Sequence, residues 1–165
     1  MNRPVLCLIL LVLGLAACKK KVDEQPSPED SLRGGAWHRT SIKVSYKEPT
    51  TNRDTIIDIM DQVPDCVKDN RLEFKTNHEG VEQRGGDKCS AGDPDTAPFY
   101  WEMVNAGTGL HIYNADETFL GNSGINADIL TLTPNALTFR YRITEQDPLD
   151  PQADMVFTFT EIYRR

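Results

Sequence analysis

The sequence predicts an all-β domain of several short antiparallel strands, preceded by an export signal and a polar tether. Two observations carry this fold class. From residue 34 onward, stretches in which apolar and polar residues alternate recur, and clusters of Gly, Asn, Asp or Pro separate them. Helical periodicity is confined to one short segment. Strands with one wet and one dry face close into a barrel or pack as a sandwich, and periodicity alone leaves both open.

Residues 1–17 are predicted to be an export signal. An apolar run over 5–17 has the length of a secretory signal core and is too short to span a membrane. Its end, Leu15-Ala16-Ala17-Cys18, resembles the lipobox of bacterial lipoproteins. This resemblance implies that Cys18 is lipidated, becomes the first mature residue and anchors the protein to a membrane. An ordinary cleaved signal peptide is the alternative. Lys19, with no aspartate in its place, favours sorting to the outer membrane, and the side of that membrane stays open.

Residues 18–33 are predicted to be the lipidated cysteine and a flexible tether. Segment 19–33 is rich in charged residues and holds two prolines and only two large apolar residues, so it cannot bury enough surface to fold. The folded domain is therefore expected to cover 34–165.

The charge balance argues against a nucleic-acid partner. Removal of residues 1–17 takes away one charged residue, Arg3, and leaves 17 basic and 25 acidic side chains, a net charge of −8. Nucleic-acid binding requires a basic surface. The basic cluster 19–21 would lie beside the membrane, where a polar spacer explains it.

The first strand of the domain is expected to contain a β-bulge. Trp37 has odd parity, whereas Ile42, Val44 and Tyr46 share even parity. In a regular strand, Trp37 would point away from the face that these three line. A bulge between 38 and 41 would bring all four to one face.

The segment after the first strand is predicted to be a short helix. Asp54 can cap a helix in which Ile56, Ile57, Met60 and Val63 recur at helical spacing until Pro64 ends it. A strand over 55–60 is the competing interpretation. Strands are expected near 36–46, 70–76, 80–84, 97–103, 109–114, 117–121, 125–133, 136–144 and 154–163.

Two cysteines remain in the mature domain, Cys66 and Cys89. In an exported protein such a pair is expected to form a disulfide, worth on the order of 3 kcal/mol in the chain-entropy model. Neither cysteine lies in a CxxC motif or near a suitable histidine, which argues against metal ligation and thiol catalysis.

Two motifs resemble a known family. Gly35-Ala36-Trp37 matches the Gly-x-Trp of lipocalins, and the segment 66–74, CVKDNRLEF, followed by Gly80, Cys89 and Trp101, is similar to the lipocalin-like domain of Bacteroidota lipoproteins. The resemblance implies an eight-stranded antiparallel up-and-down barrel. It also implies that Gly35 and Trp37 form a plug at the closed end, with Arg164 or Arg165 stacked on the Trp37 ring.

A closed barrel would enclose an aromatic-rich interior. The candidate cavity lining is Leu72, Phe74, Phe99, Trp101, Met103, Leu137, Phe139, Tyr141, Phe157 and Phe159. Eight-stranded barrels are narrow enough for their own side chains to fill them, so a solid core is the alternative. Glu161 shares parity with Phe157 and Phe159. It is either a carboxylate in a pocket or a residue at the strand end in solvent.

The sequence offers no catalytic or metal-binding constellation. His38, His78 and His111 have no ligand spacing, and the acidic loop 147–154 lacks a calcium-binding pattern. No phosphate-binding loop or cofactor motif occurs. We therefore expect a non-enzymatic protein without a cofactor or metal.

Two functions remain from the sequence. The first is a lipid-anchored envelope protein that binds a small hydrophobic or amphipathic molecule in its barrel, at the end away from Trp37. The second is a filled barrel that acts as a protein- or glycan-interaction module, with loops 47–65 and 85–98 as its contact surface.

Overall fold

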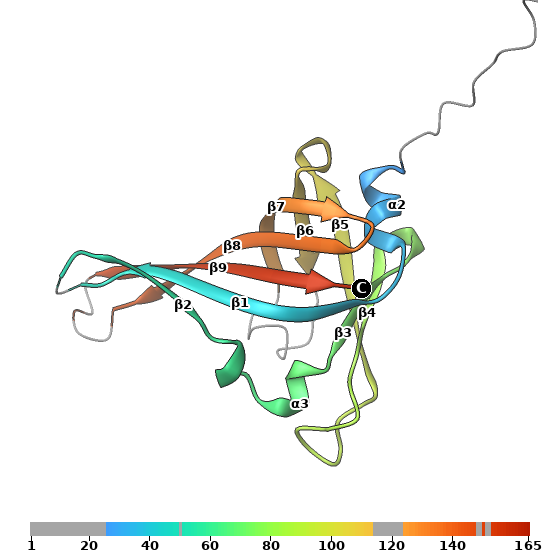
Figure 1. Cartoon of the computed structure of the whole chain (residues 1–165), viewed down its shortest axis with the longest axis horizontal. Coiled ribbons are helices and arrows are strands. Elements are labelled where there is room, and N and C mark those ends of the chain that lie inside the picture. The colour runs from blue at the N-terminus through green and yellow to red at the C-terminus, as the bar shows by residue number, and fades with distance from the viewer. Residues whose placement is uncertain (1–25, 50, 114–123, 148–149, 151–152) are drawn as a thin grey trace, which may run out of the picture.

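The computed structural model describes residues 26–49, 51–113, 124–147, 150 and 153–165, which form an all-β fold (Figure 1). Cys18 and the predicted strand at 117–121 lie outside the described residues. The strands are β1 (Trp37–Lys47), β2 (Asp54–Asp58), β3 (Arg71–Phe74), β4 (Glu79–Gln83), β5 (Thr96–Val104), β6 (Gly109–Tyr113), β7 (Gly124–Thr133), β8 (Ala136–Gln146) and β9 (Asp154–Arg164).

Helices are few and short. They are α2 (Pro28–Arg33), α3 (Asp65–Lys68) and the 3-10 turns η2 (Met60–Gln62), η3 (Thr76–His78) and η4 (Asn105–Gly107). Among these described helices, none has the length and apolar composition needed to cross a membrane.

Eight strands close into the expected antiparallel barrel, in the order β1-β3-β4-β5-β6-β7-β8-β9. β1 closes it by pairing with β9 from His38↔Arg164 to Ser45↔Thr158. On its other edge, β1 pairs with β3 at only two positions and then with β2, from Lys43↔Asp58 to Lys47↔Asp54. β2 is therefore an addition to the barrel, on an edge of β1 that β3 leaves free.

The predicted bulge in the first strand is confirmed. The register between β1 and β9 shifts between Arg39 and Ser41, so Thr40 is the extra residue. On either side of the bulge, Trp37, Ile42 and Val44 are all buried. A single inserted residue thus reconciles the two parities.

The predicted helix over 54–63 is wrong, and the competing strand interpretation is right. Residues Asp54–Asp58 form β2, and the short helix comes later, at Asp65–Lys68. A helix over 54–63 would have buried its apolar residues against the core, yet Ile56 and Ile57 are exposed. The free edge of β1 supplies backbone partners instead, and β-branched isoleucines suit a strand.

The tether expected over 18–33 ends earlier than predicted, because Pro28–Arg33 form α2. Ser27 caps this helix by accepting a hydrogen bond from the Asp30 N–H, and Pro28 stands in its first turn. Leu32 is fully buried in the barrel core. Burial of this one large apolar residue in the core accompanies the folding of the last part of the tether into a helix.

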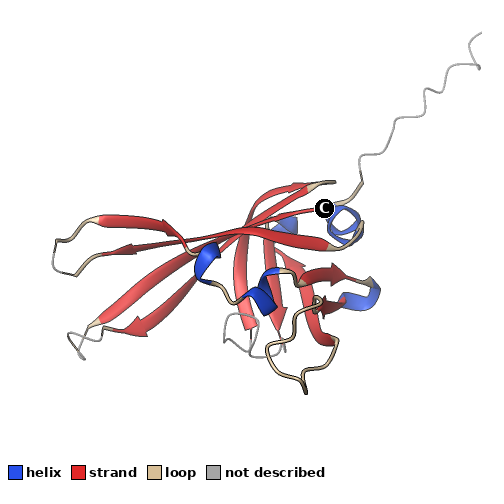
Figure 2. Ribbon diagram, turned by 60° about the horizontal axis from the view of Figure 1, so that its bottom comes forward, coloured by secondary structure: helices blue, strands red, loops and turns tan. Residues whose placement is uncertain are grey.

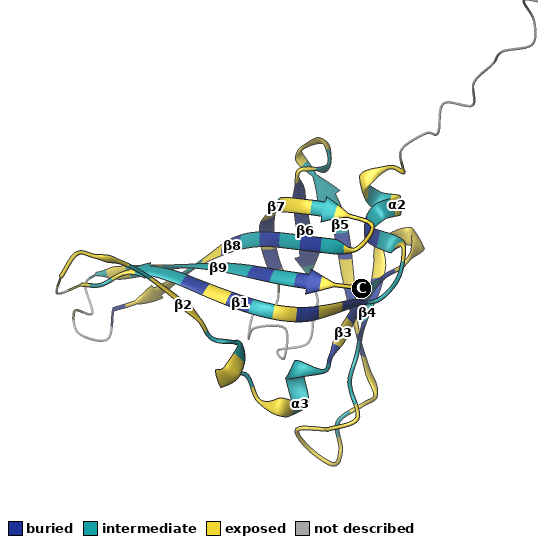
Figure 3. Cartoon of the chain, in the orientation of Figure 1, coloured by how far each residue is buried: buried dark blue, intermediate teal, exposed yellow. Residues whose placement is uncertain are grey.

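The interior of the barrel is filled by its own side chains. Figure 3 colours the buried positions along the strands dark blue. Phe74 makes edge contacts with Phe99 and Trp101, with ring centroids 5.4 and 5.6 Å apart. Six large aromatic residues are less than 2% exposed: Trp37, Phe74, Phe99, Trp101, Phe139 and Tyr163. Such rings dominate the energy of a core.

The two ends of the barrel differ because the strands differ in length. β1, β8 and β9 have 11 residues each, whereas β3 has four and β4 and β6 have five. The β1–β2 and β8–β9 hairpins consequently project beyond the barrel, away from α2 (Figure 2). We call the end at α2 the closed end and the end with the hairpins the open end.

Candidate functional site at the open end

A buried charged cluster lies inside the barrel, between the two ends. Glu161 is fully buried, and its Oε2 atom lies 2.9 Å from Nε of the buried Arg39. The Tyr141 hydroxyl donates to Glu161 Oε1 at 2.9 Å, and the Tyr163 hydroxyl donates to Oε2 at 2.5 Å. Each carboxylate oxygen therefore has partners from this chain, which a buried charge requires.

The protonation states in this cluster follow from burial and charge. Burial, followed by the charge of Glu161, raises the pKa of Tyr141 far above its usual value, and burial likewise raises the pKa of Tyr163. Burial disfavours the charge of Arg39, but Glu161 and Tyr163 outweigh it and raise the pKa of Arg39. The tyrosines are thus neutral donors and Arg39 is a permanent cation.

The interpretation of Glu161 as a strand-end residue in solvent is wrong. It lies within the barrel, opposite Ile42 of β1 and Phe139 of β8. Parity placed it with the inward-facing residues. Arg39, its partner, was missed because a charged residue is not expected to face a core, although it shares the parity of Trp37 on the same side of the bulge.

A second polar connection lies on the β3–β4 wall. Asn70 Nδ2 donates to Glu82 Oε1 at 3.0 Å, and Asn70 Oδ1 accepts the Gly85 N–H at 3.2 Å. Asp69 Oδ2 accepts the Gly86 N–H at 2.9 Å. Asp69 and Asn70 therefore tie the start of β3 to the end of β4. The inward Glu82 gave no sequence signal.

The expected disulfide between Cys66 and Cys89 is present. It joins α3 to the loop between β4 and β5, so two connections at the open end are fixed to each other. The cross-link reduces the conformational entropy of the unfolded chain and so has a structural role.

The inner side of the projecting hairpins carries apolar side chains that are only partly covered. Register places Phe157 opposite Ile143, and Phe159 opposite Val44 and Tyr141. The Tyr46 and Phe157 rings lie 5.6 Å apart, and Tyr141 stacks on Phe159 at 5.3 Å. We define the hairpin face as the apolar residues on the inner side that are partly or fully exposed: Tyr46, Ile57, Ile143, Met155, Phe157 and Phe159.

The predicted cavity-lining residues divide into two groups. Most are buried in mutual contact in the core: Leu72, Phe74, Phe99, Trp101, Leu137, Phe139 and Tyr141. Met103 and Phe159 are partly buried and pack against that core, and Phe157 belongs to the hairpin face. Of the partly exposed residues of this set, Phe157 and Phe159 lie at the open end, and Met103 lies beside α2 at the closed end.

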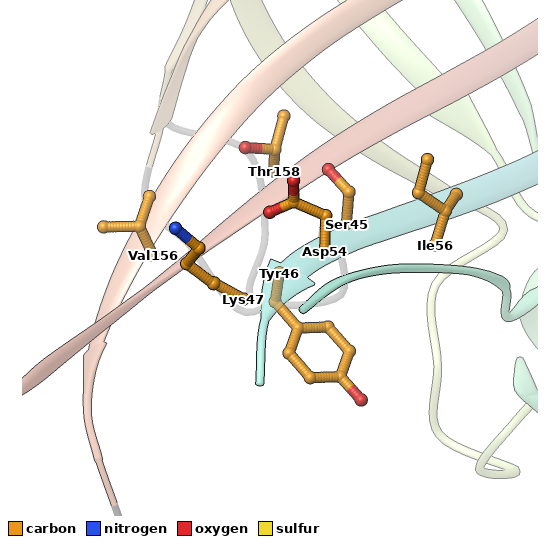
Figure 4. Close-up of a pocket in the computed structure, with 7 residues that line it drawn as sticks. All are labelled: Ser45, Tyr46, Lys47, Asp54, Ile56, Val156 and Thr158. Atoms are coloured by element: carbon orange, nitrogen blue, oxygen red, sulfur yellow. The ribbon is translucent and has the colours of Figure 1, made fainter. Parts of the chain in front are cut away.

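A groove of about 390 Å³ lies on the outer side of the same hairpins (Figure 4). Ser45, Asp54, Ile56 and Thr158 point to one side, while the Tyr46 ring points to the other. The remaining lining residues are Lys47 and Val156. The hairpins thus present apolar groups on both sides.

At the closed end, Trp37 is fully buried and donates from Nε1 to the Leu32 carbonyl at 2.8 Å. Arg165 lies over its ring, with the guanidinium carbon 3.9 Å from the ring centroid. Arg165 also donates to the carbonyls of Pro134 and Ser31, both at 2.6 Å. Arg165, rather than Arg164, occupies the position that the resemblance implies. The adjacent Gly35 has φ of 153°.

The histidines lie apart from this site. His38 and His78 are exposed, and His111 Nδ1 lies 2.9 Å from Glu102 Oε1 on the outer wall. Within the described ranges, no group of three or more His, Cys, Asp or Glu side chains is placed to hold a metal ion.

Comparison with known proteins gave no match, either to a protein-family model or to a curated protein.

Proposed function

We propose that this protein is a lipid-anchored lipoprotein of the outer membrane that binds a small apolar or amphipathic molecule at the hairpin face, without catalysing a reaction. The lipobox-like sequence that ends at Cys18 supports the anchor. The observation that carries the binding function is the hairpin face itself. It continues the inward-facing rows of β1, β8 and β9 past the filled core and leaves aromatic rings partly exposed.

The anchor and the site would lie at opposite ends of the molecule. The chain enters the barrel through α2, which packs at the closed end beside Trp37 and Arg165. A membrane attached through Cys18 would therefore lie at the closed end. The hairpin face would point away from the membrane, accessible to molecules in the surrounding compartment.

The binding mode in this proposal is shallow. Tyr163, Phe139 and Trp101 occupy the interior at the level where a deep ligand would sit. A planar ring or a short acyl chain can instead lie against Phe157 and Phe159. The floor of the site is the Tyr141 ring, whose hydroxyl is already bonded to Glu161.

Extraction and native mass spectrometry of the protein purified from its own membranes would test this function. We expect a co-purified small molecule and a mature chain that begins at an acylated Cys18. The variant Cys18→Ser should leave the membrane fraction. A chain without a lipid, or one that retains no small molecule and does not bind apolar probes, would contradict the respective half of the proposal.

The filled core also supports a second candidate, a non-enzymatic module that binds an envelope protein or glycan. In that case the contact surface would be formed by 47–65 and 85–98, which the Cys66–Cys89 disulfide links. Failure of all small apolar probes, together with retention of an envelope component on the immobilised protein, would favour this candidate.

A further inference from the structure

The free edge of β2 is a surface that belongs neither to the closed barrel nor to the hairpin face. β2 pairs with β1, and no other described strand lies along its second edge. Natural proteins cover or shorten such edges because their unpaired backbone groups bind further strands.

The backbone groups that face this edge can be assigned from the β1–β2 ladder. Glu48 N–H donates to the Arg53 carbonyl and Ile59 N–H donates to the Ile42 carbonyl, and these two bonds lie at either end of the ladder that runs from Lys43↔Asp58 to Lys47↔Asp54. Because hydrogen-bonded pairs alternate in an antiparallel ladder, the odd-numbered residues of β2 bond to β1. The N–H and C=O groups of Asp54, Ile56 and Asp58 therefore point to the free edge.

The side chains of β2 also suit a covered strand better than a solvated one. Ile56 and Ile57 point to opposite faces of the sheet, yet they are 70% and 40% exposed. A neighbouring strand on the free edge would cover both of them at once. A ligand on the hairpin face alone would reach Ile57 but not Ile56.

We infer that the edge of β2 binds an extended segment of a partner protein, in which an apolar residue is flanked on each side, two positions away, by Lys or Arg. On the outer face, Asp54 and Asp58 flank Ile56 at this spacing. β1 already shows the complementary pattern, since Lys47 lies opposite Asp54 and Lys43 lies opposite Asp58. A basic segment would repeat that complement on the other edge.

A second copy of this chain is the less suitable occupant. Antiparallel self-pairing centred on Ile56 would place Asp54 of each chain opposite Asp58 of the other, so four carboxylates would face each other in pairs. The inference rests on the backbone of β2 and on Asp54, Ile56 and Asp58, none of which belongs to the hairpin face. It gives the second candidate function a defined surface and partner chemistry.

The test uses the folded domain labelled with ¹⁵N and the peptide acetyl-Thr-Lys-Thr-Val-Thr-Lys-Thr-amide as the probe, with a peptide that carries Glu in place of Lys as its control. We expect the basic peptide to slow amide exchange at Ile56 and Asp58, whose N–H groups face the edge. The Ile57 amide, already bonded to β1, should change little. The acidic peptide should bind at least tenfold more weakly.

Two matched variants separate edge pairing from other modes of binding. Ile56→Lys adds a positive charge at the edge, which repels the basic peptide and should weaken its binding at least tenfold. Val156→Lys changes another outward apolar residue, on β9, where it pairs with Thr144 of β8 and does not lie on the β2 edge; it should leave binding unchanged. A spectrum with unchanged dispersion confirms that each variant is folded.

Three outcomes would overturn the inference. These are no binding at millimolar peptide, equal loss in Val156→Lys and Ile56→Lys, or a concentration-dependent dimer that Ile56→Lys abolishes. The second would indicate docking in the outer groove, and the third would indicate a second copy. Binding of apolar probes at Phe157 and Phe159 is measured on the protein alone, so the two proposals fail separately.

Discussion

The closed end and the open end of this barrel are built from the same inward-facing rows of residues, but they differ in how completely those rows are covered. At the closed end, Trp37 is fully buried, its N–H is bonded to Leu32, and Arg165 covers its ring. At the open end, the same rows continue into Phe157 and Phe159, which are only partly covered.

Strand length explains the difference. The short strands β3, β4 and β6 form only part of the barrel wall, while β1, β8 and β9 extend beyond it. Where all eight strands are present, side chains meet across the barrel and fill it. Where only the long strands remain, their inner side has no opposite wall among the described residues. The comparison predicts that stability lies in the closed end and core, and that binding lies in the hairpins.

The largest expected effect concerns the cluster that joins the two ends. Arg39→Met should reduce the free energy of unfolding by about 3–5 kcal/mol, because it leaves the Glu161 carboxylate buried without its cation. Denaturant titration measures this change. The double variant Arg39→Met/Glu161→Gln should recover part of the loss, and a loss below about 1 kcal/mol in the single variant would contradict a buried charge pair.

Removal of the disulfide should affect the open end selectively. Cys66→Ser with Cys89→Ser should cost about 3 kcal/mol of global stability in the chain-entropy model. Hydrogen exchange should become faster in 59–70 and 84–95 than around Trp37. Uniformly faster exchange at both ends would show that the ends are not independent.

Arg165→Ala tests the closed end. Loss of the contact with the Trp37 ring and of hydrogen bonds to carbonyl groups should cost about 1–2 kcal/mol. Tryptophan fluorescence should report greater solvent access at Trp37. The neighbouring exposed residue provides the control, since Arg164→Ala should change stability by less than about 0.5 kcal/mol.

Alkaline pH should weaken the core before it changes the hairpins. The pKa values of Tyr141 and Tyr163 are raised in the folded state, so their contribution is complete below about pH 10 and is lost as pH rises above that value. Each tyrosine contributes a slope of up to about 1.4 kcal/mol per pH unit. Tyr141→Phe should flatten the loss measured between pH 10 and 11.5, and an unchanged slope would contradict the assignment.

Local patterns in the sequence predicted the all-β class and most of the strands, whereas the closed barrel was expected only from the resemblance. Alternation located the strands, and a parity mismatch between Trp37 and Ile42 located the bulge to within a few residues. The helix prediction failed at Ile56 because local periodicity contains no information about the free edge of β1, which pairs with this segment. The tether prediction failed at Leu32 because a single apolar residue stabilises a helix only where the rest of the fold provides a site that buries it.

The site was less predictable for a physical reason. The disulfide follows from the number of cysteines, but Arg39 and Glu82 are inward charges that break the apolar alternation rather than follow it. Their positions depend on partners far apart in sequence, Glu161 and Asn70. The division of the aromatic residues into core and hairpin face also depends on strand length across the barrel, which no single segment encodes.

The central claim, that the hairpin face binds small apolar molecules, can be tested with two variants of adjacent residues. Phe157 lies on the inner face, where its ring contacts Tyr46, and Val156 lines the outer groove on the same strand. Titration with N-phenyl-1-naphthylamine measures binding by fluorescence. We expect Phe157→Ser to weaken the probe at least tenfold while Val156→Ser binds as the wild type does. Equal affinities for all three proteins, or a greater loss in Val156→Ser, would contradict the account.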